Sequence, residues 1–71
     1  MSGVIHIDPE IMSGIPVFRG TRVPIKNLFD YFEGGHSLPE FLDDFPTVKK
    51  EQVIRLLRDV QDEALKVRHA A

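Results

Sequence analysis

The sequence predicts a mainly α fold, namely a tri-helical helix-turn-helix preceded by a short N-terminal β segment. Three segments after residue 24 carry apolar residues at helical spacing, and glycines and prolines separate them. Before residue 24, short apolar runs are interrupted by turn residues. The 71 residues contain no repeat and no linker, so we predict a single domain over residues 1–71. Its β segment covers residues 1–24 and its three helices cover residues 25–71.

The N-terminal β segment is predicted to be a small irregular sheet. Residues 4–7 alternate in polarity, which is typical of a short strand. Residues 15–23 predict one or two more short strands with a turn at Gly20. Pro16 and Pro24 flank this stretch, and proline is tolerated at sheet edges and strand ends.

The first helix is predicted to have Pro24 in its first turn, where the missing N–H costs nothing. Gly34 and Gly35 then form a strong stop signal. Between them, four apolar residues follow the i, i+3, i+4, i+7 pattern of one helix face: Ile25, Leu28, Phe29 and Phe32.

The second helix is predicted to be short and firmly capped. Ser37 and Glu40 are three residues apart and form a capping box, with Pro39 in the first turn. Pro46 ends the helix. Its apolar stripe consists of Leu38, Phe41, Leu42 and Phe45.

The third helix is predicted to begin near residues 47–49 and to run toward Arg68. Its apolar residues alternate spacings of four and three, which gives a heptad-like seam. Ile54 and Leu65 lie about 100° from this seam. A bundle of this size cannot cover both faces, so we predict that a second copy does, as a homodimer. The candidate interface residues are Val53, Leu57, Val60, Ala64, Leu65 and Val67.

Charge is distributed unevenly along the chain. The net charge of −2 argues against strong, unaided nucleic-acid binding. Residues 1–48 carry −4, however, and residues 49–71 carry +2. In a helix-turn-helix, the early residues of the second motif helix reach base edges. The candidate DNA-binding residues are therefore Lys49, Lys50, Gln52, Arg55 and Arg58.

Two observations favour a role without DNA. The basic residues of the third helix can instead form a solvated face with i, i+4 pairs such as Glu51–Arg55 and Arg58–Asp62. The helix that normally crosses the DNA backbone carries carboxylates, which repel phosphates. These carboxylates are Glu40, Asp43 and Asp44.

The residue inventory gives no sign of catalysis. The chain has no cysteine, and its three histidines are scattered without the spacing of metal ligands. It contains no nucleophile elbow and no phosphate-binding loop. We therefore expect no enzymatic activity, no metal and no cofactor. Neither a signal peptide nor an apolar run of membrane-spanning length is present, so we expect a cytoplasmic protein with no membrane association.

Residues 14–25, Gly-Ile-Pro-Val-Phe-Arg-Gly-Thr-Arg-Val-Pro-Ile, form a distinctive segment. With the helices that follow, this segment strongly resembles domain-of-unknown-function family 433, whose members are interpreted as VapB-like antitoxins. The resemblance covers roughly residues 5–60. The motif residues are Gly14, Pro16, Arg19, Gly20, Thr21, Arg22 and Pro24.

The resemblance implies a homeodomain-like helix-turn-helix and a type II toxin–antitoxin context. The implied partners are a PIN-like nuclease toxin, which the chain would neutralise, and operator DNA, through which it would repress its own operon. The alternative is a protein-interaction module that dimerises through its C-terminal helix and binds no DNA. Lys49 stands where the family often has Thr or Ser, which leaves Thr47 as the candidate cap of the third helix.

The arginines of the motif allow two interpretations. Arg19 and Arg22 around a glycine turn could cradle an anion. The structural alternative, which we favour, is that Gly20 permits a turn with positive φ and that Arg22 pairs with a carboxylate such as Asp8.

Overall fold

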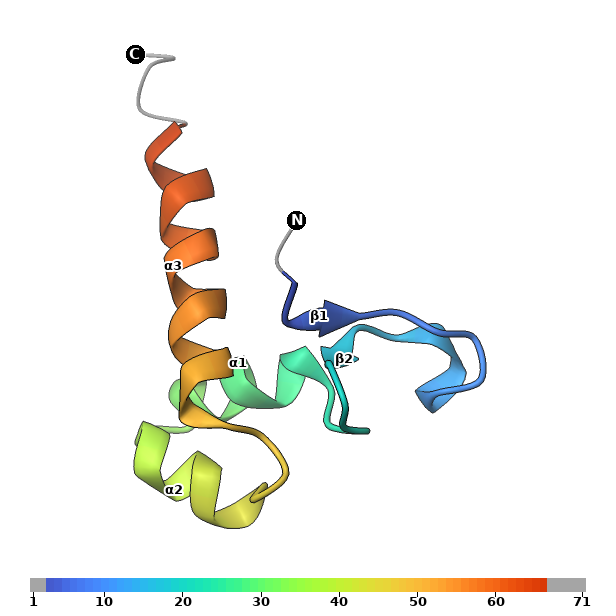
Figure 1. Ribbon diagram of the computed structural model, residues 1–71. Coiled ribbons are helices and arrows are strands. Elements are labelled where there is room, and N and C mark those ends of the chain that lie inside the picture. The colour runs from blue at the N-terminus through green and yellow to red at the C-terminus, as the bar shows by residue number, and fades with distance from the viewer. Residues whose placement is uncertain (1–2, 67–71) are drawn as a thin grey trace.

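The structure, a computed structural model that describes residues 3–66, has the predicted fold class: three helices preceded by a short two-stranded sheet. The helices α1 and α2 lie near the N-terminal end of the long helix α3, and the sheet lies to one side of it (Figure 1). The elements are β1 (Ile5–His6), a 3₁₀ turn (Met12–Gly14), β2 (Val17–Phe18), α1 (Ile25–Glu33), α2 (Leu38–Asp44) and α3 (Lys50–Lys66).

The sheet is smaller than the sequence suggests. Strands β1 and β2 pair antiparallel, with Ile5 opposite Phe18 and His6 opposite Val17. Val17 also forms an isolated bridge to Pro24, so β2 is paired on both sides. The predicted turn is confirmed, because Gly20 has φ +81° and the N–H of Thr21 donates to Phe18 O at 3.0 Å.

Helix α1 begins at Ile25, the predicted start of the helical part, but Pro24 precedes its first turn instead of lying in it. Pro24 has ψ 139° and is extended, because it still takes part in the bridge to β2. Gly34 and Gly35 end the helix as expected. Phe32, predicted to lie on the buried face, is 36% exposed, whereas Leu28 is fully buried. The neighbouring Tyr31 packs against the core instead, with its ring against those of Phe41 and Phe45.

Helix α2 has the predicted capping box. The N–H of Glu40 donates to Ser37 Oγ at 3.3 Å, and the N–H of Ser37 donates to Glu40 Oε1 at 2.8 Å. The helix ends at Asp44, before Pro46. Its Phe41 side chain is fully buried and packs against the rings of Phe18, Tyr31 and Phe45.

Helix α3 begins at Lys50, so Thr47 does not set its start. The N–H of Lys49 donates instead to the side chain of Gln52, at 3.0 Å from Oε1. Gln52, a candidate DNA-binding residue, thus caps the start of the helix. The predicted C-terminal end at Arg68 lies outside the described residues.

The core joins the sheet to all three helices. None of the helices within residues 3–66 combines the length and apolar character that a bilayer span requires. Apolar side chains that are nearly or fully buried come from β2, α1, α2, α3 and the loop before α3. They are Val17, Phe18, Leu28, Phe41, Val48, Val53 and Leu56.

Candidate nucleic-acid interface

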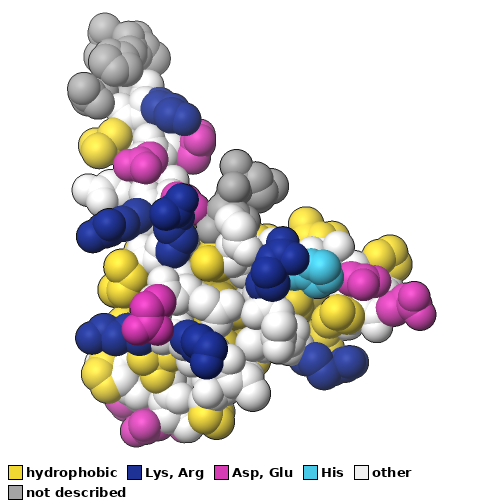
Figure 2. All heavy atoms as spheres, viewed as in Figure 1, with side chains coloured by type: hydrophobic (Ala, Val, Ile, Leu, Met, Phe, Trp, Pro, Cys, Tyr) yellow, Lys and Arg dark blue, Asp and Glu magenta, His cyan; other side chains and the backbone are white. Residues whose placement is uncertain are grey.

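The start of α3 presents exposed cations. Lys49 and Lys50 precede and open the helix, and Arg58 lies two turns further along. Because residues 50, 54 and 58 are spaced by four, Lys50, Ile54 and Arg58 share one face. That face borders a shallow hollow. Figure 2 shows Lys and Arg side chains along α3 with acidic side chains between them.

Arg55 is an ion-paired member of the candidate set. Its Nε lies 3.6 Å from Asp59 Oδ1, and the arginine side chain is 68% exposed. The expected pairs Glu51–Arg55 and Arg58–Asp62 are not formed in the described part of the chain. An exposed pair of this kind contributes about 0–1 kcal/mol. Arg55 can therefore exchange Asp59 for a phosphate at little cost.

Gln52, predicted as a base-reading residue, has both ends of its amide engaged within the chain. Its Oε1 accepts from the N–H of Lys49, and its Nε2 donates to Arg19 O at 3.0 Å. The second bond joins residues 33 positions apart. No local sequence signal marks such a long-range bond. In this arrangement Gln52 is a bridge between α3 and the hairpin turn.

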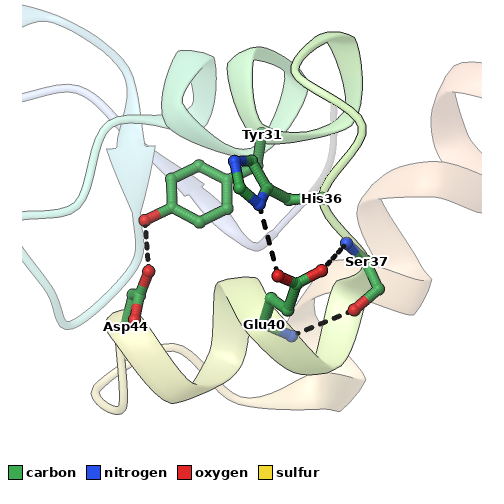
Figure 3. A network of polar contacts seen from close by, with 5 residues as sticks. All are labelled: Tyr31, His36, Ser37, Glu40 and Asp44. Carbon is green, nitrogen blue, oxygen red and sulfur yellow. Dashed lines mark hydrogen bonds and ion pairs between the residues drawn. The ribbon is translucent and has the colours of Figure 1, made fainter.

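Two acidic residues of α2, Glu40 and Asp44, bond to neighbouring groups (Figure 3). The backbone N–H of Ser37 and the ring of His36 lower the pKa of Glu40. Tyr31 Oη donates to Asp44 Oδ2 at 2.6 Å, and this bond raises the pKa of the tyrosine. Asp43 is exposed. Glu40, Asp43 and Asp44 thus give α2 an exposed acidic face.

Arg19 has a structural role that sequence reasoning missed. Its Nε donates to Gly3 O at 2.7 Å, and its Nη2 donates to Ile5 O at 3.2 Å. Nη1 lies 3.2 Å from Nδ1 of His6. This guanidinium therefore fixes the N-terminal segment against β2, which supports the structural interpretation of this part of the motif.

Arg22 differs from the favoured expectation. The carboxylate of Asp8 accepts from the N–H of Glu10 at 2.9 Å and lies 3.9 Å from His6 Nε2, so it does not pair with Arg22. Arg22 is exposed and has no side-chain hydrogen bond or ion pair within residues 3–66. Thr21 holds the turn, because its Oγ1 donates to Phe18 O at 2.8 Å and accepts from the N–H of Val23 at 3.0 Å.

The predicted interface residues of α3 separate into two groups. Val53 is fully buried in the chain's own core and Leu57 is half-buried. Val60, Ala64 and Leu65 are exposed. Val67 lies outside the described residues. Within the described residues, the exposed members of the seam therefore lie in the C-terminal part of α3, which Figure 1 shows extending beyond the other elements.

No cluster of three or more His, Asp or Glu side chains in residues 3–66 is arranged to hold a metal ion. The described geometry thus comprises a capped three-helix unit, a fixed hairpin turn and exposed cations at the start of the third helix. This defines a small helical protein with a helix-turn-helix arrangement and an N-terminal β segment.

Comparisons with known proteins identify the family of the chain. The family described as "Protein of unknown function (DUF433)" matches residues 5–58, most of the sequence, and the chain belongs to this family. It is also similar to an uncharacterized protein, y4eO, of Sinorhizobium fredii (strain NBRC 101917 / NGR234). The two are 34% identical over 50 residues, which is 70% of this chain and 23% of the relative. The match thus spans less than a quarter of that relative's length. No solved structure matches the chain.

Proposed function

We propose that this protein is the antitoxin of a type II toxin–antitoxin pair. In this proposal it neutralises a PIN-like nuclease toxin, represses its own operon by binding operator DNA, and has no enzymatic activity of its own. The observation that carries the DNA-binding part is the group of exposed cations at the start of α3, the second helix of the helix-turn-helix. The antitoxin part rests on the family resemblance.

The cations divide naturally between phosphates and bases. Lys49 and Lys50 are flexible point charges suited to backbone phosphates. Arg55 and Arg58 lie further along the helix, where a guanidinium can bond in a bidentate manner to guanine. Since Gln52 is engaged within the chain, its role in this proposal is to hold the helix start rather than to contact a base.

The C-terminal half of α3 is the proposed site of protein contacts. Val60 is 46% exposed and Leu65 is 49% exposed. Between β1 and this half of α3 lies a groove whose apolar lining includes Ile5, Leu56 and Val60. A second copy or the toxin would bury these side chains, and burial of an exposed aliphatic side chain is favourable by roughly 1.5–3 kcal/mol at most.

A second candidate function is a protein-interaction module that binds no DNA. The acidic face of α2 favours it, because Glu40, Asp43 and Asp44 would approach the phosphate backbone in a conventional docking. The two proposals agree on the role of the C-terminal half of α3 and differ only on the role of its first turns.

The first test is co-expression with the product of the adjacent gene, followed by size-exclusion chromatography with mass determination. A stable complex in which nuclease activity is suppressed supports the antitoxin proposal. A chain that elutes alone and leaves the neighbour's activity unchanged contradicts it.

The second test is a titration of a fluorescein-labelled duplex from the region upstream of the gene. The variant Lys49→Ala/Lys50→Ala is expected to lose affinity strongly at low salt. The matched control removes two cations that pair with carboxylates elsewhere, Lys26→Ala/Lys66→Ala, with the same change in net charge. Equal losses in both variants, or no binding by the wild type with or without the toxin, would favour the module without DNA binding.

A further inference from the structure

The hairpin turn of the family motif lies against the start of α3. Gln52 Nε2 donates to Arg19 O, at the first residue of the turn, and Gln52 Oε1 accepts from the N–H of Lys49. One side chain thus bonds both to the turn and to the residue that precedes α3. The turn, residues 19–22, is hereafter called the wing.

Hydrogen bonds hold the wing both within the turn and to the N-terminal segment. Thr21 closes it with the hydrogen bonds to Phe18 and Val23, and Gly20 adopts the positive φ that the bend requires. The Arg19 guanidinium ties the same turn to the carbonyls of the N-terminal segment. The Cα of Arg22 is therefore presented from a fixed point of the backbone rather than from a loose loop.

The unpaired cations of residues 3–66 are confined to this region. Lys26, Arg55 and Lys66 each contact a carboxylate on their own helix. Arg19 is bonded to backbone carbonyls. The exposed cations that have neither an ion pair nor a side-chain hydrogen bond within the described residues lie on the wing, directly before α3 or in α3 up to its midpoint: Arg22, Lys49, Lys50 and Arg58.

We propose that the wing is a second DNA-contacting element and that Arg22 binds a backbone phosphate beside the groove that receives the first turns of α3. This inference rests on the proposed DNA binding and deepens it by assigning the wing a ligand. A backbone contact at a fixed distance from the recognition helix sets the position of the protein along the duplex without reading bases. Gln52 is a positioning residue in this arrangement, because its bonds hold the wing at that distance.

The test measures the salt dependence of binding to the fluorescein-labelled upstream duplex for the wild type and for Arg22→Gln. The logarithm of the association constant falls linearly with the logarithm of the salt concentration, and loss of one phosphate contact makes this negative slope shallower by about 0.9. The ratio of the association constant of wild type to that of Arg22→Gln then falls by about 3.5-fold between roughly 50 and 200 mM salt. The same change is expected on a duplex of unrelated sequence, because phosphates carry no base identity.

Two controls separate a local contact from a change in net charge. Lys26→Gln removes one exposed cation from α1, where it pairs with Asp30, and is expected to keep the wild-type slope. Arg22→Lys keeps the charge and is expected to keep most of the slope. If wild type binds and Arg22→Gln keeps the same slope, the wing contact is overturned while the proposed function stands. If wild type does not bind DNA at all, both are overturned.

The positioning role of Gln52 has its own readout. In Gln52→Ala, which changes no charge, the wing loses its bond to the start of α3. Arg22→Gln is therefore expected to change the slope by less than half of its effect in the wild-type background. Circular dichroism at the assay temperature confirms that the helices are retained in both backgrounds. An undiminished effect of Arg22→Gln would overturn the positioning role.

Discussion

The bridge made by Gln52 can be tested as a contribution to stability, independently of any ligand. Gln52→Ala removes both hydrogen bonds of the amide, one to Arg19 O and one from the N–H of Lys49. The first joins the hairpin turn to α3, and the second satisfies an N–H at the start of that helix. The substitution therefore weakens a tertiary link and a helix cap in a single step.

The expected cost is worked from these two bonds. A neutral hydrogen bond contributes about 0.5–1.5 kcal/mol net, and because both bonds are exposed, each is expected near the lower end of that range. Two bonds then give about 1–1.5 kcal/mol, from which the better helix propensity of alanine subtracts a few tenths. For a domain of this size, about 1 kcal/mol corresponds to a fall in Tm of roughly 4–8 °C.

The chain contains a matched control for this measurement. Gln61→Ala is the same substitution on the same helix, at an exposed position whose side chain makes no hydrogen bond within residues 3–66. Thermal unfolding followed by circular dichroism is expected to place Gln52→Ala several degrees below Gln61→Ala. Equal melting temperatures for the two variants would refute the bridge.

Three further predictions concern the core, the cap and the seam. Phe41→Ala removes a fully buried ring and is expected to cost about 3–5 kcal/mol, a large part of the roughly 4–10 kcal/mol available to a domain of this size, seen as a large fall in Tm. The pKa of Glu40 is lowered in the folded state. The ionised Glu40 side chain therefore stabilises the fold fully above its ordinary pKa of 4.5, and this contribution is lost as the pH falls through the lower pKa of the folded state. The Tm of Glu40→Gln is therefore expected to fall less than that of wild type between neutral pH and about pH 3. An equal fall in both proteins would contradict a stabilising role of the Glu40 carboxylate in the cap. Val60→Asp/Leu65→Asp is expected to stay folded but become monomeric in light scattering, and a monomeric wild type would contradict the dimer.

The sequence predicted those elements whose ends are set by local chemistry. Gly34 and Gly35 stop α1, and the reciprocal bonds of Ser37 and Glu40 start α2, because each signal acts over one turn of chain. Gly20 marked the hairpin turn for the same reason. Such signals need no knowledge of the tertiary structure.

The sequence did not predict the features that depend on contacts between distant segments. The periodicity of α1 placed Phe32 inside, yet the aromatic cluster around Phe41 takes Tyr31 and leaves Phe32 exposed. The bonds of Arg19 to the N-terminal segment and of Gln52 to the turn likewise join residues far apart in sequence. Periodicity identifies an apolar face but does not say which of two adjacent side chains meets the core.

The same limit explains why the exposed part of the predicted α3 seam is shorter than the heptad spacing indicated. The helix uses Val53 and Leu56 for its own core, and every residue from 60 to 66 is exposed. The residues proposed to contact DNA precede this exposed segment, and those proposed to contact a protein lie within it. Val60→Asp/Leu65→Asp should therefore abolish assembly without removing any cation of the wing or helix start. Loss of DNA affinity in a monomeric Val60→Gln/Leu65→Gln variant, which adds no negative charge, would show that DNA binding requires the dimer, as expected when two copies contact two half-sites.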